Sequence, residues 1–126
     1  MKKIINTDQA PAPVGPYSQA VQAGNILYCS GQISIDPKTN QVLLGSVQEQ
    51  TELIMKNIDA VLKAAGAQWS QIVKTNIFLI NMGDFPVVNE IYGRYFPSNP
   101  PARSTIAVAA LPKGVSVEIE VTALLS

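Results

Sequence analysis

The chain has 126 residues, of which 47% are hydrophobic and only 14% are charged, and its formal net charge is zero. This length predicts one domain, residues 1–126, with a core of its own. The charged fraction lies below the ~25% typical of soluble domains, which favours burial of part of the surface against another subunit. Affinity for nucleic acid depends on clustered Lys and Arg. The balanced charge, without a basic stripe, therefore argues against nucleic acid as a partner.

The N-terminal segment and the cysteine content favour the cytoplasm. Residues 1–6 hold only two consecutive apolar residues before the chain turns polar, whereas a signal peptide needs a longer apolar stretch. The longest apolar run, Ile106–Leu111, is far shorter than the ~20 residues that span a bilayer. The single cysteine, Cys29, cannot form an internal disulfide. We therefore expect a protein of the reducing cytoplasm without a membrane segment.

The sequence contains no histidine. This excludes Ser-His-Asp and Cys-His nucleophile systems, imidazole acid–base catalysis and the usual zinc sites. Neither of the glycine-rich phosphate loops, GxGxxG or GxxxxGK[ST], occurs. No metal site is predicted, and any chemistry must use carboxylate, guanidinium, hydroxyl, amine or backbone groups together with water.

The first forty residues predict a loop, two short strands and a turn. The proline-rich residues 9–17 are unsuited to a helix or a central strand and predict an extended loop. Residues 19–23 and 25–30 have the alternation of strands and are joined at Gly24. Residues 36–40 carry turn chemistry.

Ser46 marks the start of the clearest predicted element. Ser46 and Glu49 have the spacing of a capping box. Apolar residues then recur at helical spacing as far as Ala65, and Gly66 is a candidate to end the helix. The other helix face carries two pairs of opposite charge at i,i+4 spacing, Glu52 with Lys56 and Asp59 with Lys63.

The C-terminal half predicts three strands and a second helix. Residues 73–80, 103–109 and 115–124 have strand composition, and a helix that Asp84 caps runs from there to about Phe96. The order of strands, helix, strand, helix and two strands predicts an α+β fold, in which two helices pack on one face of a mixed β-sheet.

The two arginines of the chain have different surroundings. Arg94 follows Glu90 by four residues on the predicted helix, so a surface ion pair accounts for it. Arg103 opens a strand and has no acidic residue within ten positions. It is either an exposed strand-end arginine or a guanidinium that grips a ligand carboxylate through two parallel hydrogen bonds.

Glu118 and Glu120 alternate with apolar residues, so they point to the face of their strand that lies opposite the core. A hairpin around Pro112-Lys113 would place Thr105 opposite Glu120, with Arg103 on the same face and Glu118 near it. Such a face could bind a small carboxylate and place a water molecule. An ordinary solvated sheet face is the alternative interpretation, and Glu120 is a supporting or surface residue in either case.

Three further residues are weighed as candidates. We expect Cys29 to be a small buried hydrophobic residue rather than a reactive thiol. Lys74 could form a Schiff base, but a solvated strand lysine is the expected interpretation. Gly31 follows Ser30 at a strand end, where the absence of a side chain lets a ligand approach the backbone.

Several separated motifs of the chain resemble the reactive intermediate deaminase family, RidA (also called YjgF), over the full length. The matching segments are Gly15-Pro16-Tyr17-Ser18-Gln19, Ser30-Gly31-Gln32, residues 57–66, Val73-Lys74-Thr75, residues 88–92, Pro101-Ala102-Arg103-Ser104, Leu111-Pro112-Lys113 and Val117-Glu118-Ile119. The resemblance implies a chorismate-mutase-like fold and a homotrimer with its sites in the clefts between subunits. It also implies hydrolysis of 2-iminobutanoate and 2-iminopropanoate to 2-oxo acids and ammonia, without a cofactor.

The resemblance also assigns roles to residues. Arg103 would clamp the substrate carboxylate, and Glu118 would hold and activate the attacking water. Substrate-binding residues would be Tyr17, Ser30, Gly31, Asn89 and Thr105, the last at a position where the family often has cysteine. A non-enzymatic regulatory trimer that binds small carboxylates is the main alternative. The family has also been linked to ribonuclease or translation-inhibitor activity, against which the neutral charge and missing histidines argue, and mutase chemistry rests on fold analogy alone.

Overall fold

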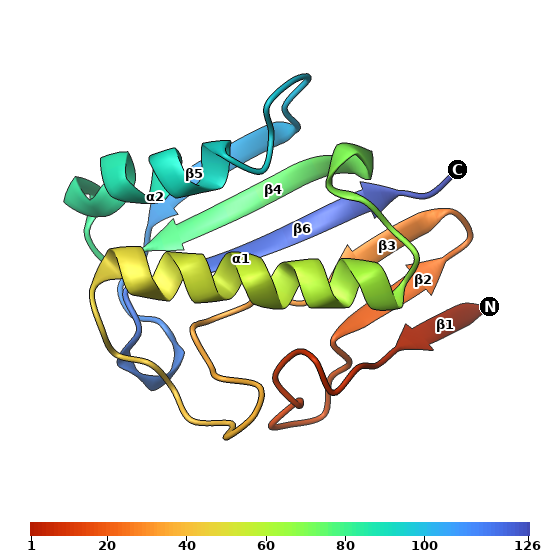
Figure 1. Ribbon diagram of the computed structural model, residues 1–126, viewed down its shortest axis with the longest axis horizontal. Coiled ribbons are helices and arrows are strands. Elements are labelled where there is room, and N and C mark those ends of the chain that lie inside the picture. Colours follow the sequence, from red (N-terminus) through yellow and green to blue (C-terminus); the bar gives the residue numbers. More distant parts are fainter.

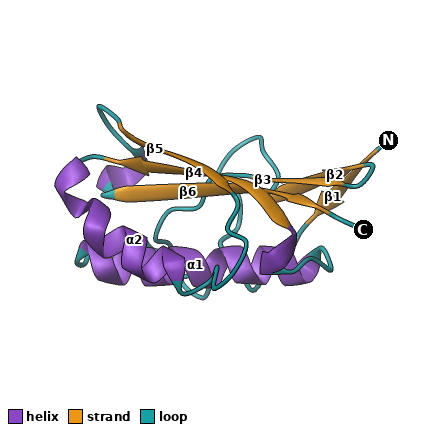
Figure 2. Ribbon diagram, turned by 90° about the horizontal axis from the view of Figure 1, so that it is seen from above, coloured by secondary structure: helices purple, strands orange, loops and turns teal.

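Two α-helices pack on one face of a six-stranded mixed β-sheet in the computed structural model, which describes residues 1–126 (Figure 1). The strands are β1 (Lys2–Ile5), β2 (Ala20–Ala23), β3 (Ile26–Cys29), β4 (Ile72–Leu79), β5 (Ala102–Ala107) and β6 (Val117–Leu124), and their order in the sheet is β1-β2-β3-β6-β4-β5. The helices are α1 (Val47–Ala64) and α2 (Phe85–Gly93). Seen along the sheet, both helices lie on the same side of it (Figure 2). The predicted fold class is confirmed.

The two helices share a face because both connect strands in the same direction across the sheet. Helix α1 links β3 to β4, which run parallel with β6 between them, and α2 links β4 to its parallel neighbour β5. Connections between parallel strands are almost always right-handed. Two right-handed connections that advance in one direction put both helices on one side and leave the opposite sheet face open.

Helix α1 begins and ends as the sequence predicts. The backbone N–H of Glu49 donates to Ser46 Oγ at 3.1 Å, and the Ser46 N–H donates to Glu49 Oε1 at 3.0 Å, which is the reciprocal capping box. At the other end Gly66 has φ +71°, and the N–H of Ala67 reaches back to the Leu62 carbonyl at 2.8 Å. This is a Schellman ending, which favours glycine because its backbone is left-handed.

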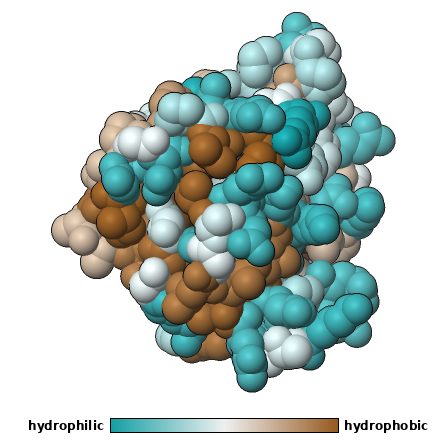
Figure 3. Space-filling view, turned by 60° about the vertical axis from the view of Figure 1, so that its left-hand side comes forward, coloured by the Kyte–Doolittle hydropathy of each residue, from teal (hydrophilic) through white to brown (hydrophobic).

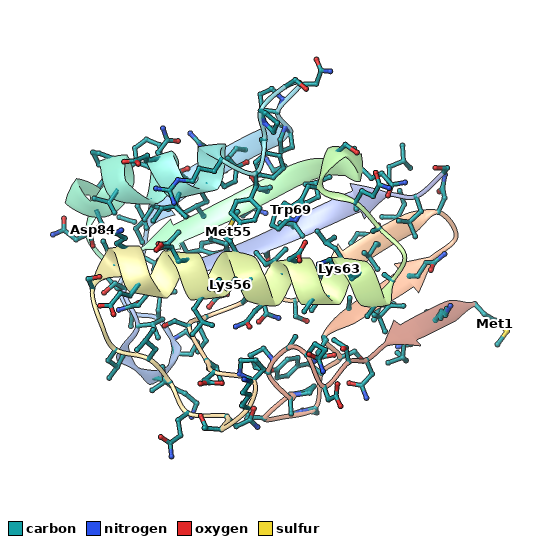
Figure 4. The ribbon with its side chains drawn as sticks, viewed as in Figure 1. Met1, Met55, Lys56, Lys63, Trp69 and Asp84 are labelled. Atoms are coloured by element: carbon teal, nitrogen blue, oxygen red, sulfur yellow. The ribbon has the colours of Figure 1, made fainter.

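The surface charges of the helices follow the prediction in part. Lys63 pairs with Asp59 at 2.9 Å, and Arg94 pairs with Glu90 at 3.1 Å. No ion pair joins Glu52 to Lys56, which agrees with the small free energy of such exposed pairs. On α1 itself, Met55 is fully buried, whereas its neighbour Lys56 is exposed; both are labelled in Figure 4.

The second helix differs from the prediction at both ends. Asp84 makes no side-chain capping hydrogen bond, and Asn81 instead accepts from the N–H of Gly83 at 2.9 Å in a short 3-10 turn, Met82–Asp84. The helix stops at Gly93 rather than near Phe96. The aromatic rings beyond it turn toward Trp69, whose ring centroid lies 4.6 Å from that of Tyr95. Beyond Gly93 the backbone N–H groups of Tyr95 and Phe96 donate to carbonyls three residues back, so the α-helical pattern ends there.

A single buried core fills the space between the sheet and the helices. It draws on alternate residues of the central strands and on one side of each helix, and includes Leu27, Ile54, Ile58, Leu62, Ile77, Leu79, Val88, Val117, Ile119 and Val121. Two buried amide side chains are paired with backbone carbonyls: Asn57 Nδ2 donates to that of Ile35 at 2.9 Å, and Gln19 Nε2 donates to that of Pro11 at 2.9 Å. The second of these bonds ties the proline-rich loop to β2.

The predicted β5–β6 hairpin is wrong. Strand β5 pairs in parallel with β4, and β6 pairs antiparallel with the other edge of β4, so β4 separates them. A strand, helix and strand in succession form a right-handed crossover between parallel strands, and in the β4–α2–β5 segment these two strands are direct neighbours. Strand β1 was not predicted: it is a short edge strand that begins with two exposed lysines.

Candidate active site

Arg103 lies on the helix-covered side of the sheet, at the exposed edge formed by β5. Its register partner on β4 is Thr75, whose side chain is buried against α2. The guanidinium carbon lies 5.0 Å from the ring centroid of Tyr92 and 5.1 Å from that of Phe85. Its Nη1 donates to Asn89 Oδ1 at 2.7 Å. Two aromatic faces and one amide therefore hold an exposed guanidinium in a fixed place, with N–H donors left for a ligand.

Glu118 lies on the opposite face of the sheet. Its register partner on β4 is Phe78, whereas the neighbouring Ile119 and Val117 point into the core. Its carboxyl group lines a cavity of about 460 Å³ between the proline-rich loop, the segment after β3 and the 3-10 turn Pro112–Gly114. The residues around this cavity are Pro11, Val14, Tyr17, Gln19, Ser30, Gly31, Gln32, Ile33, Ile35, Pro112, Lys113, Glu118 and Glu120.

Gly31 is the point at which the backbone comes closest to the Glu118 carboxyl group. A Cβ atom at position 31 would lie 2.9 Å from Glu118 Cδ and in closer contact still with Oε2. Real Cβ atoms essentially never come this close to another heavy atom, so only glycine leaves the carboxylate where it is. The prediction at Gly31 concerned a ligand and stays a prediction; within the chain, the group that lies against this backbone is the Glu118 carboxyl group.

The surroundings of Glu118 favour its protonated form. Partial burial, followed by the negative charge of Glu120 on the same strand face, raises the pKa of the Glu118 carboxyl group above its ordinary value. Glu118 accepts no hydrogen bond within the chain, whereas Glu120 Oε1 accepts one from Asn76 Nδ2 at 2.9 Å. A carboxyl group with a raised pKa and free oxygens inside a cavity is suited to proton transfer.

The structure does not bring Arg103 and Glu118 together within one chain. They lie on opposite sheet faces with β4 between their strands, because the hairpin expected to join them does not form. Thr105, expected opposite Glu120, pairs instead with Ile77 and points to the helix-covered face. One chain therefore presents two half-sites, an arginine half-site with Asn89 and Thr105 and a carboxylate half-site with Glu118 and Gly31.

The remaining predicted substrate-binding residues divide between the half-sites. Tyr17 and Ser30 line the Glu118 cavity, but the Ser30 hydroxyl already donates to the Ser18 carbonyl at 2.6 Å. Asn89 is engaged with Arg103. Thr105 Oγ1 is buried and has no hydrogen-bond partner, and it is the one such side-chain atom in the structure.

Sequence reasoning missed several residues around both half-sites. Phe85 and Tyr92 flank the Arg103 guanidinium, and Asn76 binds Glu120. Lys113 is a cavity residue with φ 56°, a left-handed backbone that is uncommon outside glycine and asparagine. The alternation of strand β4 could have placed Asn76 beside the glutamates, but the pairing of β4 with both neighbours had to be known first.

Cys29, which is half-buried, and Lys74 are the remaining residues that were weighed. Burial raises the pKa of the Cys29 thiol to about 12, which makes it a poor nucleophile near neutral pH. Lys74 Nζ donates to the Ser104 hydroxyl at 3.2 Å on the open face. No three His, Cys, Asp or Glu side chains converge as a metal site. Neither α1 nor α2 is long and apolar enough to cross a membrane.

Comparison with known proteins gives matches over nearly the whole chain. A family model described as endoribonuclease L-PSP matches residues 7–125. A protein of Mus musculus named 2-iminobutanoate/2-iminopropanoate deaminase is 48% identical over 98% of this chain and 92% of its own length. The crystal structure of YyfA from Yersinia pestis, a Rid family protein of unknown function, has a TM-score of 0.97 and 49% identity, covering 99% of this chain and all of that one. TdcF of E. coli with bound serine has a TM-score of 0.93 and 39% identity, covering 98% of this chain and 99% of that one.

Proposed function

Because this chain belongs to the RidA (YjgF) family, the family that the matching model describes as endoribonuclease L-PSP, we propose that it is a cytoplasmic enzyme that hydrolyses 2-imino acids to 2-oxo acids and ammonia. The single observation that carries this proposal is the pair of half-sites. One offers a fixed guanidinium for a carboxylate, and the other offers a protonatable carboxyl group in a cavity. The deaminase name of the mouse relative, and the amino acid bound to the E. coli relative, support a small carboxylate substrate.

In the proposed reaction Arg103 holds the substrate carboxylate and Glu118 handles protons. The Glu118 carboxylate takes a proton from water as the water oxygen forms a bond to the imine carbon. The C=N π electrons move to nitrogen, which gives a carbinolamine. Glu118 returns its proton to this nitrogen, the carbon–nitrogen bond breaks and ammonia leaves, and the proton of the added hydroxyl group passes to the Glu118 carboxylate as the carbon–oxygen double bond of the 2-oxo acid forms. An iminium carbon is already electrophilic, so positioning alone can lower the barrier by several kcal/mol. No cofactor takes part in this scheme.

We further propose that a second copy of the chain completes each site. Arg103 and Glu118 leave opposite faces of one sheet, so a substrate that touches both requires the arginine half-site of one subunit to face the carboxylate half-site of the next. A closed ring of three such head-to-tail contacts gives the homotrimer that the family resemblance implies. The unpaired Thr105 hydroxyl, two residues after Arg103 on the same face, would meet a partner in such a contact.

The open sheet face supports this assembly, since large apolar side chains lie exposed on it and exposed apolar patches are typical of interaction sites. Tyr28 is 54% exposed on β3, and Ile106 is 48% exposed on β5. Apolar surface is not confined to this face: Figure 3, which brings the left-hand side of Figure 1 forward, shows apolar patches among polar groups there as well. Light scattering on the purified protein should give three times the mass of the chain, and a stable monomer would contradict the proposal.

The activity is tested by generating 2-iminobutanoate with a threonine dehydratase and trapping the surviving imine with semicarbazide. Added protein should accelerate imine loss. Arg103→Ala should lower kcat/KM by at least about 100-fold, because two hydrogen bonds to a charged group contribute about 3 kcal/mol or more. Arg94→Ala is the matched control, since it removes the other arginine from a surface ion pair, and it should retain activity. If the wild-type protein binds 2-oxobutanoate but leaves the imine signal unchanged, the chain is a carboxylate-binding regulator instead.

Subunit complementation tests the shared site. Arg103→Ala and Glu118→Gln should each be inactive alone. When they are unfolded together and refolded as a mixture, some contacts will join an intact arginine half-site to an intact carboxylate half-site, and activity should return. Failure of the mixture to recover activity, with mixed oligomers demonstrated by mass spectrometry, would place both residues in a site within one chain.

A further inference from the structure

The two glutamates that line the cavity are held differently. Glu118 and Glu120 lie two residues apart on the same face of β6, and both border the cavity. Glu120 faces Asn76 directly across the β4–β6 pair and accepts its amide hydrogen bond at 2.9 Å. Glu118 faces Phe78, which offers no donor, and forms no hydrogen bond within the chain. The cavity thus contains one anchored carboxylate and one unanchored carboxyl group.

We propose that Glu120, anchored by Asn76, is a positioning residue whose fixed negative charge keeps the proton on Glu118 exchangeable in the working pH range, so that Glu118 alone moves protons. This inference rests on the proposed function, since it assigns the division of labour within that site. It gives a role to a glutamate that would otherwise be a surface residue and to an asparagine that binds no substrate.

The division follows from elementary electrostatics. An amide N–H that donates to a carboxylate stabilises its ionised form, so Asn76 favours a charged Glu120. Residues two apart on one strand face are separated by about 6.6 Å, a distance at which like charges repel in a partly buried site. While Glu120 is ionised, Glu118 therefore holds its own proton more tightly, in agreement with the raised pKa of that group. Pairs of carboxyl groups whose surroundings separate their proton affinities commonly divide acid and base roles in this way.

Within the chain few other charges face Glu118, and in the proposed assembly Arg103 of a neighbouring subunit would face it as well. Lys113 reaches the cavity from the 3-10 turn and Tyr17 from the proline-rich loop. From β4, across the sheet, come Asn76 and Phe78, which do not titrate; Lys74, farther along, is hydrogen-bonded to Ser104. The only anion among these groups is Glu120, so removal of its charge should have a measurable effect on Glu118.

Glu120→Gln tests the proposal, because glutamine keeps an acceptor oxygen for Asn76 and removes only the charge. The Glu118 side-chain carboxyl signal is followed by carbon-13 NMR against pH in the assembled, glutamate-labelled protein and is assigned by its loss in Glu118→Gln. The midpoint should move to lower pH in Glu120→Gln, and the acid limb of kcat/KM should move with it. Glu90→Gln, which removes a carboxylate paired to Arg94 on the surface of α2, should leave the midpoint in place.

The salt dependence of the Glu118 midpoint, compared between the wild-type protein and Glu120→Gln, provides a second measurement. About 1 M salt screens charges beyond roughly 3 Å, so it should lower the Glu118 midpoint in the wild-type protein and have less effect in Glu120→Gln. An unmoved midpoint in folded Glu120→Gln, or an equal salt effect in both proteins, would overturn the proposal and leave Glu120 as a tie between β4 and β6. If the wild-type protein fails to hydrolyse imines, the proposed function fails, while the NMR titration still decides whether the two glutamates are coupled.

Discussion

Gly31→Ala is the substitution that tests most directly whether the position of the Glu118 carboxyl group matters. The backbone of Gly31 is not in the left-handed region, so alanine adds no backbone strain. The added methyl group would lie 2.9 Å from Glu118 Cδ and 3.2 Å from Cγ. Ordinary van der Waals contact begins at 3.4 Å, so the carboxyl group must move by at least 3.4 − 2.9 = 0.5 Å at Cδ. The clash with Oε2 requires a larger displacement.

This displacement should damage catalysis far more than stability. The atoms that must move are the end of a flexible side chain that has no hydrogen bond to lose, so the free energy of unfolding should change by less than about 1 kcal/mol. A misplacement of about 1 Å at a reacting group can lower the rate by about 100-fold. We therefore expect kcat/KM for 2-iminobutanoate to fall by that order while the melting temperature stays nearly constant.

The assay is the semicarbazide trap, run beside thermal unfolding of the same samples. Gly93→Ala is the matched control, because a Cβ atom at Gly93, the last residue of α2, meets nothing within 4 Å. It should leave activity intact. Wild-type kcat/KM in Gly31→Ala would refute the reasoning, since a carboxyl group that tolerates this displacement does not depend on its position. Loss of activity together with unfolding would show instead that Gly31 is needed for folding.

Three further predictions concern stability and binding. The pKa of Glu118 is raised in the folded chain, so this residue lowers the free energy of unfolding once the pH rises above the ordinary pKa of a glutamate. Glu118→Gln should therefore melt at a higher temperature than the wild-type protein at about pH 7. Calorimetry should find no such gain near pH 3.5, where Glu118 is protonated in both the folded and the unfolded state. Ser46→Ala removes the capping box, which should cost about 1 kcal/mol and lower the melting temperature by roughly 3–5 °C; an unchanged value would mean that the cap is not needed. Thr105→Val removes a buried hydroxyl that has no partner within the chain. If this hydroxyl meets a partner across the proposed subunit contact, the assembled protein should lose about 1 kcal/mol, and a melting temperature that stays the same or rises would contradict that contact.

The helices and strands of this fold could be predicted from the sequence where contacts between nearby residues determine the structure. The capping residues of α1 and the glycine after it fix that helix by contacts only a few residues apart. The alternation of Val117, Ile119 and Val121 correctly placed Glu118 on the face opposite the core. Strand β1 was missed because so short an edge strand is defined by its neighbour rather than by its own four residues.

The candidate site could be predicted in its residues but not in its arrangement. Arg103 and Glu118 have the chemistry that their strands suggested, but a hairpin between adjacent strands in sequence was the wrong pairing. The deciding contact is the insertion of β4 between β5 and β6, which joins residues far apart in the chain. The alternation along each strand was predicted correctly. Which sheet face a given side chain occupies depends on the partner strand, and the local sequence does not contain that information.

The separation of the guanidinium and the carboxyl group on two sides of one sheet has a consequence for rate laws. If each active site is formed by residues of two neighbouring chains, the specific activity depends on the protein concentration. It should decline when the protein is diluted below the dissociation constant of the assembly, with a steeper than linear dependence on enzyme concentration there. Above that threshold the turnover per chain should become independent of concentration.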